Sequence, residues 1–275
     1  MNPRYDSAVR LAAEVARAAR RPNSARTLLL DLDGTLAPLA VTPWDARVPV
    51  GTLEALEKLG RLGWSLSIVS GRPAIEVRSM VPLRGVRIFG SHGAEGQVET
   101  DAPCRVPMPP CGPLAKLAAA AVSLGSGIRG ALVEIKPAGI AFHDRAVASA
   151  DLLAWRRRVR ELLAASDLEG LEVLSGRRVV EVRRRGIDKG SVVSAVVPGG
   201  ARSGLDASLV ALGDDRTDED LFRALEGKGL TVRVGRPRGD TRAVRRLPSP
   251  KAVRRFLEEL IHASETSRGR RGSRS

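Results

Sequence analysis

Short apolar runs alternate with amphipathic helical patterns from Thr27 to Gly93, and this alternation constrains the fold more than any other feature of the chain. The order strand-helix-strand-helix-strand is typical of a parallel sheet, because parallel strands need crossover connections. The same order resumes after residue 186. We therefore expect an α/β fold in which two separated parts of the chain build one parallel sheet. The predicted strands are 27–31, 64–69, 86–89, 208–212 and 230–234, and the predicted helices are 51–62, 73–80, 188–197, 218–226 and 250–262.

Between these two parts the pattern changes to helix-strand-strand-helix-strand-strand. This order predicts an inserted α+β domain with an antiparallel sheet and helices on one face. A proline-rich stretch at 107–113 and the segment 183–186 would link it to the parallel sheet and permit hinge motion. The expected organisation is an N-terminal helix in 1–23, core parts in 24–106 and 186–262, the inserted domain in 107–185 and a disordered basic tail in 263–275.

The net charge of +14 first suggests a nucleic-acid partner. The arginines are spread over the whole chain, however, and no aromatic residues are interleaved with them for base stacking. The one dense cluster, 268–274, lies in a tail whose composition cannot pack into a core. We therefore expect no specific nucleic-acid partner, and a basic surface that attracts phosphorylated substrates.

The sequence holds no apolar stretch long enough to span a membrane and no signal-peptide-like region behind its first residues. We therefore expect a cytoplasmic protein without a membrane partner. Cys104 and Cys111 are the only cysteines, and they lack the neighbouring ligands that a metal site needs. Two free thiols in a reducing compartment are expected.

Two acids, Asp31 and Asp33, directly follow the apolar run 28–30. A parallel strand would deliver them to the loop at its carboxyl end, where α/β sheets build their ligand sites. Because strand side chains alternate, both carboxylates would point the same way, and their repulsion would need a cation or a shared proton. Gly34 lets the chain turn sharply behind them. The pattern favours Mg²⁺ and an anionic substrate, although solvated turns and calcium loops share it.

Three further motifs stand at predicted strand ends or helix starts. The Ser-Gly-Arg segment 70–72 predicts an anion site made by a hydroxyl and a backbone N–H, or an ordinary helix cap. Lys189 begins a helix, where the macrodipole disfavours it unless it neutralises phosphate or aspartate; a solvated lysine is the alternative. The acids within 213–220 repel one another unless a cation is bound, although Thr217 or Asp218 could merely cap the next helix.

In this order, D-x-D-G-T, S-G-R, lysine and G-D-D-x-x-D resemble the haloacid dehalogenase (HAD) superfamily of phosphotransferases over about residues 27–103 and 186–260. The resemblance implies a HAD-type Rossmann-like core, an inserted αββαββ cap domain and an Mg²⁺ cofactor. It also implies that Asp31 is the nucleophile, and that Asp33 protonates the leaving oxygen and later activates water. Ser70 and Lys189 would hold the phosphoryl oxygens. The implied metal site uses Asp31, the Asp33 carbonyl and Asp214, with Asp215 and Asp218 in support.

The segments 90–95, 134–145 and 176–182 are similar to those of trehalose-6-phosphate phosphatases. The sequence departs from that family at Asp144, where an aromatic residue is usual, and at Leu32, where Tyr or Phe is usual. The implied substrate contacts are Gly71, Arg72, His92, Glu134, Lys136, His143, Arg145 and Glu181. From the residues alone, the charged groups of 134–145 could also form the polar outer face of a half-exposed sheet.

The resemblance therefore implies Mg²⁺-dependent hydrolysis of trehalose 6-phosphate to trehalose and phosphate through an aspartyl-phosphate, within trehalose biosynthesis. Phosphatases of sucrose 6-phosphate or mannosyl-3-phosphoglycerate, and a phosphomutase of the same fold, are the nearest alternatives. From other classes, a basic nucleic-acid-binding protein and a silent sugar-phosphate sensor are the rivals. The amphipathic helix over 7–20 would pack on the core or bind a trehalose-phosphate synthase partner.

Overall fold

The computed structural model describes residues 6–97, 104–105, 112–136, 139–176, 178–197, 204–236 and 239–272, with the backbone alone at 97, 104–105 and 267–272. The chain divides into two compact units. The first unit comprises Met1–Leu39, Ala46–Cys104 and Asp188–Ser275, and the second comprises Ala40–Asp45 and Arg105–Ile187.

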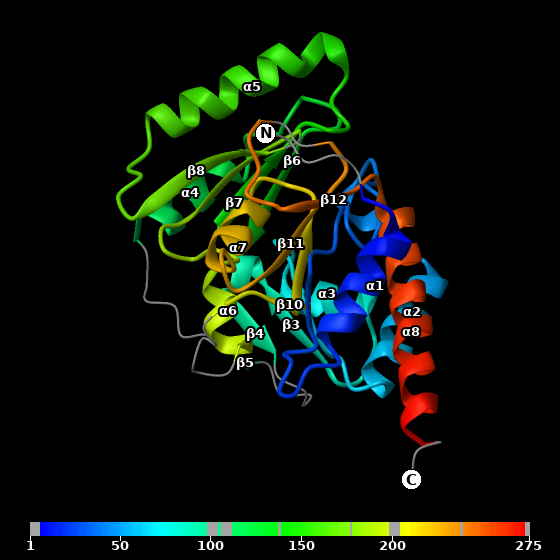
Figure 1. The fold of residues 1–275 in the computed structure, drawn as a ribbon. Helices are drawn as coiled ribbons and strands as arrows, with labels where there is room; N and C mark the ends of the chain where they lie inside the picture. The colour runs from blue at the N-terminus through cyan, green and yellow to red at the C-terminus, as the bar shows by residue number, and fades with distance from the viewer. Residues whose placement is uncertain are drawn as a thin grey trace. The chain divides into compact units, whose positions relative to one another are not determined.

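An eight-stranded sheet in the order β12-β11-β10-β1-β2-β3-β4-β5 forms the centre of the first unit (Figure 1). Neighbouring strands from β12 to β3 are parallel, and β4 is antiparallel to β3. The chain passes from β1 to one side of the sheet and returns at β10 on the other side of β1. Open α/β sheets bind ligands at such a switch in strand order. The strands are β1 Thr27–Leu30, β2 Ser65–Val69, β3 Val86–Gly90, β4 Glu95–Gln97, β5 Cys104–Arg105, β10 Asp206–Gly213, β11 Gly229–Val234 and β12 Arg245–Leu247.

Helices cover both faces of this sheet. Along β1, Leu28 and Leu30 belong to one apolar cluster and Leu29 to another, as expected for a strand buried on both faces. The larger cluster takes side chains from α1, α2 and α8, and α1 lies alongside α8 (Figure 1). The smaller cluster takes side chains from α6 and α7. The helices are α1 Ala8–Ala18, α2 Val50–Arg61, α3 Ala74–Met80, α6 Ser191–Val196, α7 Asp218–Ala224 and α8 Pro250–Gly272.

The second unit holds a four-stranded antiparallel sheet in the order β6-β7-β9-β8. Its apolar cluster joins Ile140, Phe142 and Val182 from the strands to Leu117 of α4 and Trp155 of α5. Because strand side chains alternate, these residues occupy one face and leave the other face to polar groups. The elements are α4 Gly112–Ala121, β6 Leu132–Lys136, β7 Gly139–His143, α5 Ser149–Ala164, β8 Leu171–Gly176 and β9 Val179–Arg184.

The predicted α/β class with a largely parallel sheet is confirmed. The short strands β4, β5 and β12 were not predicted, because two or three residues do not establish a period. The prediction of a disordered tail from residue 263 is wrong through Gly272, because α8 continues that far. The hydroxyls of Ser264 and Thr266 donate to carbonyls four residues earlier, and Glu265 pairs with Lys58 of α2 at 3.0 Å.

Several predictions concern residues outside those described. Cys111 and most of the proline-rich stretch 107–113 are among them, as is Arg177 in the segment 176–182. The Cys104 backbone lies in β5, and the state of its thiol stays a prediction. In the described part of the chain, no helix combines the length and the apolar character needed to cross a membrane.

Candidate active site

The switch in strand order places two acids at the same edge of the sheet. Asp31 directly follows β1 and Asp214 directly follows β10. These strands are parallel neighbours, with Leu30 opposite Leu212, and the Asp31 N–H donates to the Leu212 carbonyl at 2.9 Å. The hydrogen bonds between β1 and β10 therefore fix the distance between the backbones of the two acids at this edge of the sheet.

A buried lysine ties this edge to α7. One carboxylate oxygen from each of Asp31, Asp214 and Asp218 lies within 4.8 Å of the other two. The Lys189 ammonium donates to Asp31 Oδ1 at 2.6 Å and to Asp218 Oδ1 at 2.7 Å. Lys189 is 2% exposed, so the alternative of a solvated lysine is wrong.

The electrostatics of this group fit a bound cation. Burial, together with Asp218, raises the pKa of Asp31 to about 7, although Lys189 acts in the opposite direction. Burial and the charges of Asp31, Asp218 and Asp215 raise the pKa of Asp214 to about 9. Burial alone would lower the pKa of Lys189, but Asp218 and Asp31 raise it above its ordinary value. An oxygen-liganded divalent cation would relieve the repulsion among these carboxylates.

Asp218 is the member of this group for which the sequence predicted only a supporting or helix-capping role. Its second carboxylate oxygen accepts from the Asp215 N–H at 2.9 Å, so both of its oxygens have donors. The Asp215 carboxylate accepts from the Arg216 N–H at 2.7 Å and is not part of the group. Among the described residues, Asp31 and Asp214 therefore offer the carboxylate oxygens best placed for a cation, while Asp218 anchors Lys189.

Two glycines make the close approach of these acids possible. A Cβ atom on Gly34, whose φ is +86°, would lie 2.2 Å from Asp214 Oδ2. A Cβ atom on Gly213 would lie 2.2 Å from Asp218 Cγ. A side chain at either position would displace a carboxylate, and at Gly34 the left-handed backbone also favours glycine.

Asp33 and Arg72 form a bidentate pair. Arg72 Nε donates to Asp33 Oδ2 at 2.6 Å, and a terminal nitrogen donates to Oδ1 at 2.7 Å. The Asp33 carboxylate is thus not part of the cluster formed by Asp31, Asp214 and Asp218. The predicted role of the Asp33 carbonyl toward a metal and the predicted substrate contact of Arg72 stay predictions.

The segment 70–72 is held by the turn after β3. The Ser70 hydroxyl accepts from the Arg72 N–H at 3.1 Å. Helix α3 begins after Pro73, which makes no side-chain capping hydrogen bond. The Glu95 carboxylate accepts from the first N–H of α3, at Ala74, with a distance of 2.6 Å. The alternative in which Ser70 caps the helix is therefore wrong.

His92 lies against this segment. It is buried, has a left-handed φ of 58°, and its ring would meet a Cβ atom on Gly71 at 2.7 Å. The His92 N–H donates to the Ser70 carbonyl at 2.9 Å. The structure therefore brings His92 and Gly71 together with Ser70, and their predicted contacts with substrate stay predictions.

Four of the predicted sugar contacts form a connected row on the polar face of the second unit. The register places Glu134 opposite Ala141 and Ala141 opposite Glu181. Lys136 donates to Glu181 at 2.9 Å, and His143 Nε2 lies 2.8 Å from Glu134 Oε2. Burial opposes ionisation of Glu134, but His143 and Lys136 outweigh it and lower its pKa. The row therefore offers anionic, cationic and imidazole groups around one small residue, Ala141.

The two residues that follow His143 have partners outside the polar row. The Asp144 carboxylate accepts from Arg156 Nε at 2.7 Å and pairs with Arg178 Nε at 2.6 Å. Arg145 donates to the carbonyl oxygen of Ala40. The departure from the aromatic residue at position 144 thus introduces a buried carboxylate that joins α5 to Arg178, the residue before β9. Leu32, the other departure, is buried in the larger apolar cluster of the first unit.

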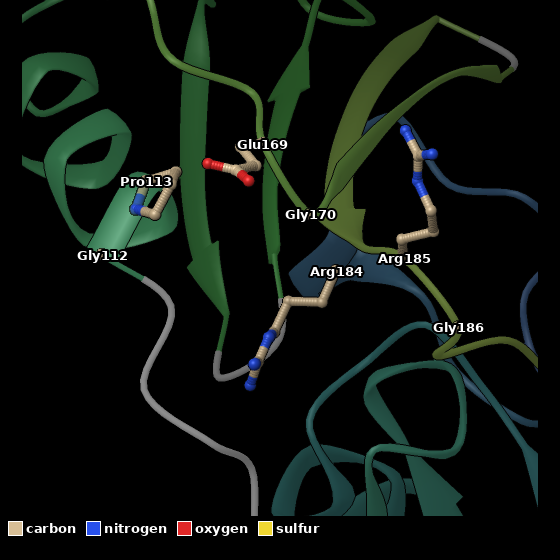
Figure 2. A pocket seen from close by; sticks show the side chains of 7 residues that line it. All are labelled: Gly112, Pro113, Glu169, Gly170, Arg184, Arg185 and Gly186. Carbon is tan, nitrogen blue, oxygen red and sulfur yellow. The ribbon is translucent and has the colours of Figure 1, made fainter.

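An open concavity of about 500 Å³ lies elsewhere in the second unit, between the starts of α4 and β8 and the end of β9. Figure 2 shows the side chains of Arg184 and Arg185 pointing in different directions around it, with Glu169 on the opposite side. None of the predicted sugar contacts lines it. The concavity is therefore distinct from the polar row.

The first unit has a HAD-type α/β fold, with acids at the switch in strand order. A haloacid dehalogenase-like hydrolase from Bacteroides thetaiotaomicron has this fold, with a TM-score of 0.58 at 17% identity over 87% of this chain and 98% of that chain. The C-terminal domain of trehalose-6-phosphate phosphatase from C. albicans is more similar, with a TM-score of 0.79 at 22% identity over 95% of this chain and 98% of that chain.

The family follows from the sequence match. Residues 29–246 match the trehalose-phosphatase family, and the chain belongs to that family. A probable trehalose-phosphate phosphatase of Sinorhizobium fredii is 32% identical over 85% of this chain and 86% of its own length. An uncharacterized glycosyl hydrolase of Mycobacterium tuberculosis is 36% identical over 88% of this chain, which spans only 18% of that relative.

Proposed function

We propose that this chain hydrolyses trehalose 6-phosphate to trehalose and inorganic phosphate with the help of Mg²⁺. The observation that carries the proposal is the buried Lys189 bridge between Asp31 and Asp218 beside Asp214. Relatives named as trehalose-phosphate phosphatases, in Sinorhizobium and Arabidopsis, support the choice of substrate.

Asp31 and Asp214 would hold Mg²⁺, together with the Asp33 carbonyl. Asp215 and Asp218 would have a supporting role next to these ligands. When bound, the cation neutralises negative charge on the transferring phosphoryl group. The raised pKa values of Asp31 and Asp214 support this assignment, because a cation favours the ionised forms that burial disfavours.

In the first step, an Asp31 carboxylate oxygen bonds to phosphorus while the bond from phosphorus to the sugar oxygen breaks. That sugar oxygen takes a proton from Asp33 and leaves as the free hydroxyl of trehalose. Lys189, 2.6 Å from Asp31, would hold the nucleophile and, with Ser70, would bind the phosphoryl oxygens. The product on the protein is an aspartyl-phosphate.

In the second step, Asp33 takes a proton from a water molecule whose oxygen bonds to phosphorus. The bond between phosphorus and Asp31 breaks, so phosphate leaves and Asp31 is again a carboxylate. Asp33 ends with the proton that it gave up in the first step, and the cycle balances. Splitting one difficult displacement into two is the advantage of the covalent route.

The polar row of the second unit would select the sugar. Glu134 and Glu181 accept hydrogen bonds from sugar hydroxyls, and Lys136 and His143 donate to them, with Arg145 as a further donor. The second unit would thereby act as the cap that the family resemblance implies. A trehalose-phosphate synthase partner and a cytoplasmic location stay predictions.

Phosphate release from a panel of sugar phosphates tests the proposal. Trehalose 6-phosphate should be turned over fastest, ahead of sucrose 6-phosphate and mannosyl-3-phosphoglycerate. Asp31→Asn should abolish turnover and retain the fold, and EDTA should abolish turnover until Mg²⁺ is added. Preference for another sugar phosphate would overturn the substrate assignment, whereas near-normal turnover by Asp31→Asn would overturn the nucleophile.

A further inference from the structure

Arg72 forms an ion pair with Asp33, the proposed acid and base of the reaction. Two of its nitrogens donate to the two carboxylate oxygens of Asp33, at 2.6 and 2.7 Å. Its third nitrogen, Nη1, lies 3.4 Å from Oε2 of Glu76 on α3. A fork of two parallel hydrogen bonds fixes the rotation of a carboxylate as well as its position.

The exposure of the two side chains shows which of them can meet a substrate. The Arg72 side chain is 10% exposed, whereas the Asp33 side chain is 32% exposed. The guanidinium is therefore largely buried while it pairs with Asp33 and Glu76, and Asp33 stays more accessible to a substrate. This arrangement fits a residue that orients Asp33 better than one that binds phosphate itself.

The backbone around Arg72 is fixed by the turn that follows β3. The Arg72 carbonyl accepts from the Ser91 N–H at 2.8 Å, and the Ser70 carbonyl accepts from the His92 N–H at 2.9 Å. Ser91 and His92 both have left-handed backbone angles, with φ values of 47° and 58°. Such conformations are costly and persist where surrounding contacts hold them. The turn thus sets the point from which Arg72 reaches Asp33.

We propose that Arg72 is the positioning residue for Asp33. It would orient the carboxyl group so that Asp33 can give a proton to the sugar oxygen that leaves phosphorus and take one from the water that attacks phosphorus. The proposal rests on the proposed function, in which Asp33 is the acid and base. It replaces a direct contact between Arg72 and substrate with an indirect role. One consequence distinguishes this role from phosphate binding. The rate for a given substrate should depend on Arg72 only to the extent that its leaving group needs a proton from Asp33.

Leaving groups of different quality make that dependence measurable. The alkoxide of a sugar phosphate needs a proton as it leaves, whereas p-nitrophenolate leaves without one. The ratio kcat/KM reports the steps through the first phosphoryl transfer, before Asp33 acts on water. We expect Arg72→Met to lower kcat/KM for trehalose 6-phosphate about 100-fold, the cost of a misplaced catalytic group, and for p-nitrophenyl phosphate less than about 5-fold.

Two further variants complete the comparison. Arg72→Lys keeps the charge and loses the fork, so its loss on trehalose 6-phosphate should lie between wild type and Arg72→Met. Arg61→Met removes an exposed arginine of α2 that pairs only with Glu57 among the described residues, and it should leave both substrates unaffected. Circular dichroism and thermal melting establish that each variant is folded.

Equal losses on both substrates would overturn the proposal. So would a rise in KM on both substrates with weaker inhibition by inorganic phosphate, because that result assigns Arg72 to phosphate binding. If the wild type prefers another sugar phosphate, the same comparison uses that substrate. A crystal structure of Arg72→Met gives a readout independent of turnover: the Asp33 carboxylate should leave its present orientation while Asp31 and Lys189 keep theirs, and an unmoved Asp33 would contradict the proposal.

Discussion

At the scale of single residues, Lys189 offers a direct test of the electrostatics of the site. Lys189→Met leaves Asp31 and Asp218 facing each other without the ammonium that lies between them. Removing one partner of a buried ion pair costs about 3–5 kcal/mol. We expect a loss of that order in the free energy of unfolding at pH 8, and a smaller loss at pH 5, where a proton shared by the carboxylates replaces part of the missing charge.

Urea unfolding of the metal-free protein at the two pH values measures this difference. Lys228→Met, which removes an exposed lysine after α7, serves as the control and should change stability by less than about 0.5 kcal/mol. A loss for Lys189→Met that is the same at both pH values would contradict the role assigned to the two carboxylates.

The sequence predicted the residues whose positions follow from the sheet. Asp31 and Asp214 could be placed together because each directly follows a parallel strand. The contact between Arg72 and Asp33 could not be predicted, because it depends on side-chain rotamers across two loops that no periodicity describes. The position of Asp218 beside Asp31 depends on the missing Cβ of Gly213, and the close spacing of acids in 213–220 was its only signal.

At the scale of elements, α1 has an apolar face that α8 covers. Leu11 and Val15 are buried in the same cluster as Phe256 and Leu260. Of the two roles considered for this helix, the structure shows packing on the core of its own unit. Leu11→Ala should therefore lower the free energy of unfolding by about 2–4 kcal/mol and leave kcat unchanged.

Val9 provides the matched control within the same helix, because its side chain is 49% exposed. Val9→Ala should change stability by less than about 0.5 kcal/mol. Chemical denaturation of the two variants in parallel checks the difference. A loss below about 1 kcal/mol for Leu11→Ala would mean that α8 does not hold α1 in solution.

The polar face of the second unit gives a prediction about the substrate. Ala141 lies in register between Glu134 and Glu181, so Ala141→Leu would fill the space between the two carboxylates. KM for trehalose 6-phosphate should rise about 10-fold or more, while kcat/KM for p-nitrophenyl phosphate should change little. Steady-state kinetics decide the matter, with Ile135→Ala, an exposed apolar residue of the neighbouring strand, as the control. Parallel losses on both substrates would show that this face does not bind sugar.

Long elements with clear periods were predicted closely, and short or basic ones were not. Strand β12 consists of Arg245, Arg246 and Leu247, which carry no apolar run, and its place depends on pairing with β11. The end of α8 was predicted too early because composition alone suggested a tail that cannot pack. Its continuation depends on local hydroxyl contacts and on the pair of Glu265 with Lys58.

At the scale of the whole molecule, the excess positive charge is distributed rather than concentrated. Arginines of both units pair with acids of their own unit, as Arg183 does with Glu172 and Arg233 with Glu219. Such a distribution favours general attraction of anions over a specific nucleic-acid surface, and the absence of a specific nucleic-acid partner stays a prediction. It also means that added salt should weaken binding of any phosphorylated substrate.

The stability of the whole molecule should depend on pH and on Mg²⁺ in a linked way. In the metal-free protein, Asp214 has a pKa of about 9 and Asp31 of about 7, against an ordinary value of 3.8. Between the ordinary value of 3.8 and these raised values, the native protein binds more protons than the unfolded chain. These two acids therefore make the free energy of unfolding fall as pH rises from about 4 to 9. We therefore expect Tm in EDTA to be lower at pH 8.5 than at pH 5.5.

Binding of Mg²⁺ to the native state alone should reverse that loss. At 100 times its Kd, a ligand of this kind stabilises by about 2.7 kcal/mol, and competition with protons makes the gain larger at pH 8.5 than at pH 5.5. Asp214→Asn removes one of the titrating acids, so its metal-free Tm at pH 8.5 should exceed that of the wild type and should respond weakly to Mg²⁺. Thermal melts of both proteins at both pH values, with EDTA and with Mg²⁺, measure all of these effects. An equal response to Mg²⁺ in wild type and Asp214→Asn would locate the cation elsewhere, because in that case Asp214 would contribute nothing to holding it.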